Sequence, residues 1–121
     1  MHQYQEALLK NTSRGDHIIV NLQIYNSTAQ QDRQQFIKAL QDLANEKNTK
    51  LDDQTRILQL RLPGTTTIAN IKQDLEKYCN QKIILMCESM VPNPLDVIGD
   101  IKSTIQKQEV NLQLCSQVIA G

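Results

Sequence analysis

The pattern that most constrains the fold of this chain is an alternation of apolar and polar residues in three separate segments. It runs through residues 17–25, 55–62 and 110–115. Because successive side chains of a β-strand point to opposite faces of a sheet, the alternation predicts strands with one buried side and one solvent-facing side. The side chains expected to face the core are Ile18, Val20, Leu22 and Ile24 in the first strand, Leu58, Leu60 and Leu62 in the second, and Val110, Leu112 and Leu114 in the last.

A further strand is predicted at residues 82–88, where the sequence KIILMCE is an almost unbroken apolar run. Strands that are buried on both faces have such runs, so we expect this strand near the centre of the sheet. Pro63 and Gly64 end the strand at 55–62, because proline has no N–H for the sheet ladder and glycine tolerates a tight turn.

Three helices are predicted between the strands. The first covers residues 28–46, where Ser27 opens an S-x-x-Q capping box. The second begins after Thr67, a favourable N-cap, and the third begins after Asn93 with Pro94 as its first residue. The expected apolar stripes are Ala29, Phe36, Ile37, Leu40, Leu43 and Ala44 in the first helix, Ile68, Ile71, Leu75 and Tyr78 in the second, and Leu95, Ile98, Ile101 and Ile105 in the third.

The predicted order of elements is therefore β-α-β-α-β-α-β. Order alone would suit a parallel α/β sheet covered on both faces, as in a small α/β enzyme or nucleotide-binding domain. The alternating strands instead favour an α+β fold of two layers, with the helices on one side of the sheet. A chain of 121 residues fits one domain, which we expect over residues 17–121 after an N-terminal tail at 1–16. The domain consists of a first strand with an inserted helix and loop (17–54) and a core (55–121).

The segment 56–75, RILQLRLPGTTTIANIKQDL, resembles the ubiquitin-like, or β-grasp, domains. In that family an alternating second strand passes through a Pro-containing turn to a Thr N-cap and the run Thr-Ile-x-Asn-Val-Lys, and residues 67–72 stand in that register. Residues 82–85 are similar to the family's basic-Leu-Ile-Phe strand, and residues 105–107 to an Ile-Gln-Lys stretch before its last strand. The resemblance covers about residues 55–116 and implies a ubiquitin-like β-grasp fold.

Two departures from that family affect the interpretation. The family joins its first two strands by a tight hairpin, whereas here the helix at 28–46 intervenes, so the resemblance implies a helix-containing insertion between the first two strands. The chain also ends on a single Gly121 rather than on the diglycine that activating enzymes adenylate in the family. Conjugation through Gly121, as in a covalent ubiquitin-like modifier, therefore remains an alternative.

No catalytic, cofactor-binding or metal-binding constellation is predicted. The only histidines are His2 and His17, and Cys79 and Cys87 do not have the C-x₂₋₄-C spacing of zinc sites. None of the glycines has the spacing of a phosphate-binding loop. We therefore expect a protein that is not an enzyme and that uses no cofactor or metal.

Charge and hydropathy exclude two classes of partner. Thirteen Lys and Arg residues balance thirteen Asp and Glu residues, and aromatic residues are 3%, so neither the basic field nor the stacking side chains of a nucleic-acid-binding protein are present. No apolar run approaches the roughly 18 residues that span a bilayer. The three cysteines, an odd number, favour an intracellular, reducing compartment, with the cytoplasm as the first expectation and the mitochondrion as an alternative.

Protein-binding surfaces are the expected functional sites. The resemblance places Ile84 at the central apolar position of the family's partner-binding patch, unless Ile84 packs against the helix at 28–46 or the tail. Arg56 and Arg61 lie on an expected edge strand, and Lys72 lies on the helix that follows. By the same resemblance, these residues are similar to the basic edge by which Ras-binding ubiquitin-like domains engage an acidic small GTPase. The alternative reading is that such residues are edge gatekeepers and solvated charges.

These expectations describe a non-enzymatic, ubiquitin-like protein–protein interaction module, an accessory or adaptor subunit of a larger assembly whose partners are other proteins. The amphipathic helix at 28–46 either covers the domain's own sheet or docks on another subunit. The alternatives are the covalent modifier and the small α/β enzyme or nucleotide-binding domain.

Overall fold

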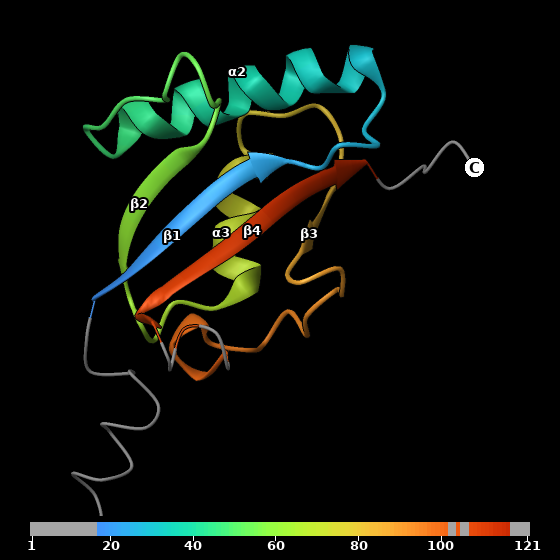
Figure 1. Cartoon of the computed structure of the whole chain (residues 1–121). Helices are drawn as coiled ribbons and strands as arrows, with labels where there is room; N and C mark the ends of the chain where they lie inside the picture. The colour runs from blue at the N-terminus through green and yellow to red at the C-terminus, as the bar shows by residue number, and fades with distance from the viewer. Residues whose placement is uncertain (1–16, 102–103, 105–106, 117–121) are drawn as a thin grey trace, which may run out of the picture.

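The structure is a computed structural model (Figure 1) that describes residues 17–101, 104 and 107–116. The tail at 1–16, Gly121 and Ile105 lie outside the described residues. The elements, in chain order, are β1 (His17–Ile24), α2 (Gln30–Glu46), β2 (Leu58–Pro63), α3 (Ile68–Glu76), β3 (Ile83–Met86), the 3₁₀-helix η1 (Ile98–Asp100) and β4 (Glu109–Ser116).

The four strands form one mixed sheet in the order β2-β1-β4-β3. β1 is antiparallel to β2 and parallel to β4, and β3 is antiparallel to β4. In Figure 1, α3 lies behind β1 and β4, and α2 crosses one end of the sheet. The fold is therefore α+β, as the alternation predicted, and not a parallel α/β sheet. The predicted helix between the first two strands is present, and β1 and β2 pair across it.

The buried side chains form one core between the sheet and helices α2 and α3. The inward rows of β1, β2 and β4 are those predicted, and Phe36 and Leu40 of α2 have no exposed surface. Helix α2 therefore covers its own sheet. The largest fully buried side chains are Phe36, Ile18, Leu22, Leu40, Leu43, Leu58, Leu75, Ile83, Ile98, Leu112, Leu114 and Val20.

Helix α3 begins as predicted, with a reciprocal cap. Thr67 Oγ1 accepts the backbone N–H of Asn70 at 3.1 Å, and Asn70 Oδ1 accepts the backbone N–H of Thr67 at 3.2 Å. Such a capping box satisfies N–H groups that the first turn of a helix leaves without partners.

The predicted capping box of α2 is wrong. Its N-cap is Ala29, which makes no side-chain cap, and Ser27 is exposed. Thr28 is instead buried, and its hydroxyl donates to the backbone oxygen of Leu114 at 3.4 Å. The start of α2 is therefore set by a contact with β4, which local spacing does not reveal.

The predicted central position of the third strand is also wrong, because β3 lies at an edge of the sheet. Ile83 and Leu85 face the core, while Ile84 and Met86 are half-buried on the opposite face. The apolar run therefore reflects partial cover on both faces, whereas β4 takes the position between β1 and β3.

The third helix does not begin at Pro94. Asn93 Oδ1 accepts the backbone N–H of Leu95 at 2.9 Å, which closes a turn rather than capping a helix. Leu95 is exposed, and the short η1 follows it, with Ile98 buried. The carbonyl of Pro94 accepts the N–H of Ala69 at 2.9 Å, so this segment caps α3 instead.

Candidate functional site

The outer edge of β2 is the candidate site, because part of its backbone has no partner within the sheet. Ile19 of β1 donates its N–H to Gln108 beside β4 at 3.1 Å. The backbone groups of successive strand residues point to opposite sides, so the neighbours of Ile19 direct theirs toward β2. Gln59 and Arg61 consequently direct their N–H and C=O groups away from the sheet. The pairs that close the ladder between β1 and β2 are Ile18 with Leu62, Val20 with Leu60, and Leu22 with Leu58.

Both ends of this edge are closed. At one end the carbonyl of Ile57 accepts the N–H of Asp52 at 3.3 Å. At the other end Pro63 has no N–H, and its carbonyl accepts the N–H of Thr66 at 3.0 Å. Within the part of the chain that the structure describes, the open stretch is therefore residues 59–61, with two outward N–H groups and two outward C=O groups.

The loop at the first end is held by Asp52. Its Oδ1 accepts the backbone N–H groups of Gln54 and Thr55, each at 2.8 Å. These hydrogen bonds, first from Thr55 and then from Gln54, hold the pKa of the Asp52 carboxyl below its ordinary value. The loop is thus fixed beside the open edge rather than free to fold over it.

The opposite edge of the sheet, β3, is closed at both ends, and its open stretch, at Leu85, is shorter than that of β2. The N–H of Ile83 donates to Glu76 Oε2 at 2.7 Å, and Cys87 exchanges two backbone hydrogen bonds with Met90. The more open of the two edges is therefore β2, and the edge position predicted for that strand is confirmed.

The three basic residues predicted for this surface are not equivalent. Arg61 is exposed on β2, beside the open backbone. Arg56 is not on the strand, which begins at Leu58: it lies in the preceding turn with a φ of 57°, so its predicted strand position is wrong. Lys72 is half-buried on α3, which packs against β3 and α2 rather than forming part of the β2 strand. Only Arg61 belongs to the open edge.

Ile84 lies on the sheet face that carries no helix in the described part of the chain, as predicted. It is half-buried and pairs in register with Cys115 of β4. The same face also carries Met86 and Ile19, but its middle is polar: the Asn21 side chain donates to Asn111 Oδ1 at 2.9 Å and accepts from Gln59 Nε2 at 3.1 Å. This amide network joins β2, β1 and β4, so the face around Ile84 is less apolar than a typical docking patch.

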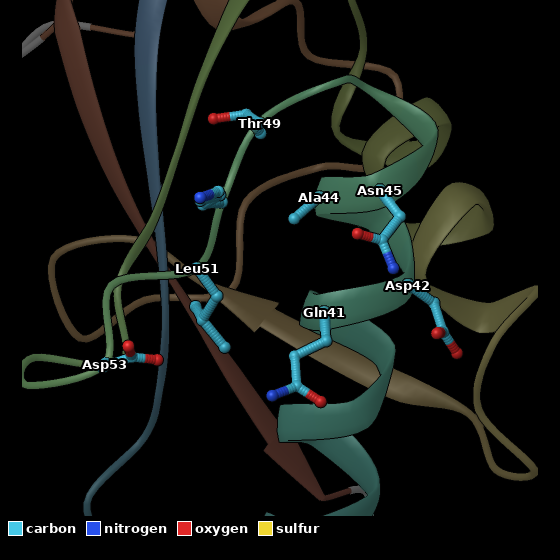
Figure 2. Close-up of a pocket in the computed structure, with 8 residues that line it drawn as sticks. Gln41, Asp42, Ala44, Asn45, Thr49, Leu51 and Asp53 are labelled. Atoms are coloured by element: carbon cyan, nitrogen blue, oxygen red, sulfur yellow. The ribbon is translucent and has the colours of Figure 1, made fainter.

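Two hollows flank the end of α2. One, of about 300 Å³, borders the open edge and is lined by Lys47, Thr49 and residues 59–62. The other, of about 340 Å³, lies between α2 and the following loop, where Gln41 and Leu51 point toward one another (Figure 2). Its lining holds no histidine or cysteine, so it offers no soft metal ligand.

The reactive side chains do not come together. Within residues 17–101, 104 and 107–116, no group of three or more His, Cys, Asp or Glu side chains could hold a metal ion. All three cysteines are free thiols. Burial, with a smaller effect of the Glu88 carboxylate, raises the pKa of the Cys87 thiol, which keeps it protonated and weakly nucleophilic. No helix of the described residues is long and apolar enough to cross a membrane.

Sequence reasoning named Arg61 but missed Gln59, whose contribution is its backbone. The edge position of this strand was predicted, but which of its backbone groups point outward depends on its register with β1. The chain matches no protein-family model and no curated protein sequence. The functional interpretation therefore depends on the geometry of the β2 edge.

Proposed function

We propose that this chain is a non-enzymatic protein-interaction module that accepts an extended segment of a partner protein as an added strand along β2. The observation that carries the proposal is the set of outward backbone groups of Gln59 and Arg61. Strand addition uses such groups for affinity and the alternating side chains for specificity.

The fold supports a ubiquitin-like, β-grasp identity for this module. A mixed four-stranded sheet packs one face on α3, and the capping box at Thr67 lies in the segment that resembles the family. Helix α2 is then an insertion between β1 and β2 that completes the core. In this proposal the chain is an accessory or adaptor subunit of a larger intracellular assembly.

The side chains along β2 indicate which partner segment fits. Arg61 is exposed on one face of the edge and has no ion pair in the described residues. On the other face Leu60 and Leu62 line the hollow beside Lys47. Because an added strand alternates its side chains, we expect an acidic residue opposite Arg61 and an apolar residue facing the hollow.

A proline substitution at Gln59 tests the proposal. The N–H of Gln59 points away from β1, so Gln59→Pro removes a hydrogen bond that only an added strand would use. Gln59→Thr is the matched control, because it changes the same side chain and keeps the N–H. The tagged chain, purified from its own cells, should retain its assembly as wild type and Gln59→Thr but lose it as Gln59→Pro, with unchanged circular dichroism.

Hydrogen exchange gives an independent measurement. The amides of residues 59 and 61 should exchange rapidly in the free chain and become protected in the assembly. An assembly that survives Gln59→Pro, or amides that stay unprotected, would exclude strand addition at β2. Species that survive full denaturation and disappear when Gly121 is deleted would indicate the covalent modifier instead.

A further inference from the structure

A second interaction surface lies in the segment between β3 and η1. Among the residues that the structure describes, four large hydrophobic side chains are exposed, and three of them belong to this segment: Met90 (71% exposed), Val91 (65%) and Leu95 (79%). Single exposed apolar residues are common on soluble proteins, but a group on one segment is typical of a contact surface. Met90, Val91 and Leu95 are called the loop patch below.

The backbone at the first end of the loop patch is fixed by a tight hairpin. The N–H of Cys87 donates to the oxygen of Met90 at 2.7 Å, and the N–H of Met90 donates to the oxygen of Cys87 at 3.0 Å. Between them Glu88 and Ser89 have φ values of 52° and 66°, in the left-handed region that Gly and Asn adopt more easily. Non-glycine residues held in that region are enriched at functional sites.

The second end of the loop patch is tied to α3. The carbonyls of Pro94 and Asp96, on either side of Leu95, accept the N–H groups of Ala69 at 2.9 Å and Ile68 at 3.0 Å. These N–H groups belong to the first turn of α3, where no helical partner exists. Both ends of the loop patch are therefore held by backbone hydrogen bonds, which lowers the entropy cost of ordering it when a partner binds.

The charged side chains within residues 87–101 are all acidic, and Lys107 lines a hollow together with Glu88 at the first end of the patch. Residues 87–101 contain no Lys or Arg. Glu88 and Asp96 are exposed at its two ends, and neither forms an ion pair within the described residues. An apolar centre with acidic flanks is complementary to an apolar groove bordered by basic side chains. The same charges disfavour contact with a second loop patch or with an anionic lipid surface.

We infer that the loop patch is a docking surface for a partner protein that presents an apolar groove bordered by Lys or Arg residues. The hairpin end of this surface follows β3, at the opposite edge of the sheet from the open backbone of β2, whereas its second end is bonded to the first turn of α3. Figure 1 shows the chain leaving β3 at the edge away from β2 and then passing below the sheet toward η1. The chain therefore can hold two partner segments at once, as an adaptor requires.

Site-specific photocrosslinking of the full chain in its own cells tests this inference. A photoreactive residue at position 91 should give one discrete protein adduct that the same residue at position 38, exposed on α2, does not give. Peptide mapping should place the crosslink in an apolar segment with neighbouring Lys or Arg residues.

Binding of the purified partner should weaken about tenfold on Leu95→Gln, which leaves the fold unchanged. The Glu88→Lys, Asp96→Lys double variant should weaken binding at low salt and much less at high salt.

Several outcomes would overturn the inference: an adduct with a second copy of the chain, an adduct with lipid, or equal labelling from positions 91 and 38. Unchanged affinity of the Leu95→Gln variant would do so as well. The crosslink should persist in Gln59→Pro, because the two surfaces share no residue. If Gln59→Pro keeps its assembly while the adduct at position 91 behaves as expected, only the proposal for β2 is wrong.

Discussion

The hydroxyl of Tyr78 donates to Glu46 Oε1 at 2.6 Å and so joins the segment after α3 to the last residue of α2. Lys77 Nζ lies 3.0 Å from the same oxygen. The hydrogen bond from Tyr78, followed by that from Lys77, lowers the pKa of the Glu46 carboxyl, and the pKa of Tyr78 is raised. The helix ends are therefore coupled through one carboxylate.

This contact predicts a pH-dependent stability. Because the pKa of Glu46 is lower in the folded chain, its contribution is present above its ordinary value of 4.5 and is lost as the pH falls through the folded pKa. Tyr78→Phe should reduce the free energy of unfolding at pH 7, and by less at pH 3. Urea unfolding at both pH values measures this.

Tyr25→Phe is the control for that experiment, because the Tyr25 hydroxyl has no hydrogen bond in the part of the chain that the structure describes. An equal loss at both pH values in Tyr78→Phe would mean that the hydroxyl acts through packing rather than through the Glu46 carboxylate.

A substitution at Phe36 tests whether the apolar face of α2 packs in the core of this chain or is left for contact with a partner protein. Its side chain is fully buried within the chain itself. Phe36→Ala should cost about 3–5 kcal/mol of the free energy of unfolding, a large part of the roughly 5–15 kcal/mol of a typical domain. Chemical denaturation of the isolated chain measures it, with Gln34→Ala on the exposed side of α2 as the control. A Phe36→Ala chain as stable as wild type would contradict the packing of α2.

Thr67 tests the local cap of α3. Thr67→Ala removes the acceptor of the Asn70 N–H and should cost about 1 kcal/mol. Thr67→Ser keeps the hydroxyl and should retain most of the stability. Thermal unfolding of the two variants side by side distinguishes loss of the cap from loss of the methyl group. Equal destabilisation of both would show that the methyl group is what matters.

The contrast between Thr67 and Ser27 shows how far sequence reasoning reaches. Both residues stand at the start of a predicted helix, and each has a suitable partner three residues later. The box at Thr67 forms, since its hydrogen bonds join residues of one turn. The box at Ser27 does not form, because the neighbouring Thr28 is drawn into a contact with Leu114, 86 residues away.

The edge position of β3 and the exposure of Leu95 were both decided by contacts between segments that are far apart in the sequence. The apolar run at 82–88 was compatible with a central strand, and the Asn93-Pro94 pair with a helix start. Because β4 pairs with both β1 and β3, β3 lies at the edge of the sheet. The carbonyls of Pro94 and Asp96 accept N–H groups from the first turn of α3, and these hydrogen bonds hold the segment in a turn. Leu95 was expected in the core and is instead exposed.

The alternation of the strands by itself determined that this chain forms a sheet with one wet face and that Ile18, Val20 and Leu22 point inward, because that period is a property of each strand alone. Only the tertiary structure decided which strands lie at the edges. It therefore decided that the backbone of Gln59 and Arg61 is open, since a hydrogen-bonding group is free or used according to its neighbours in space.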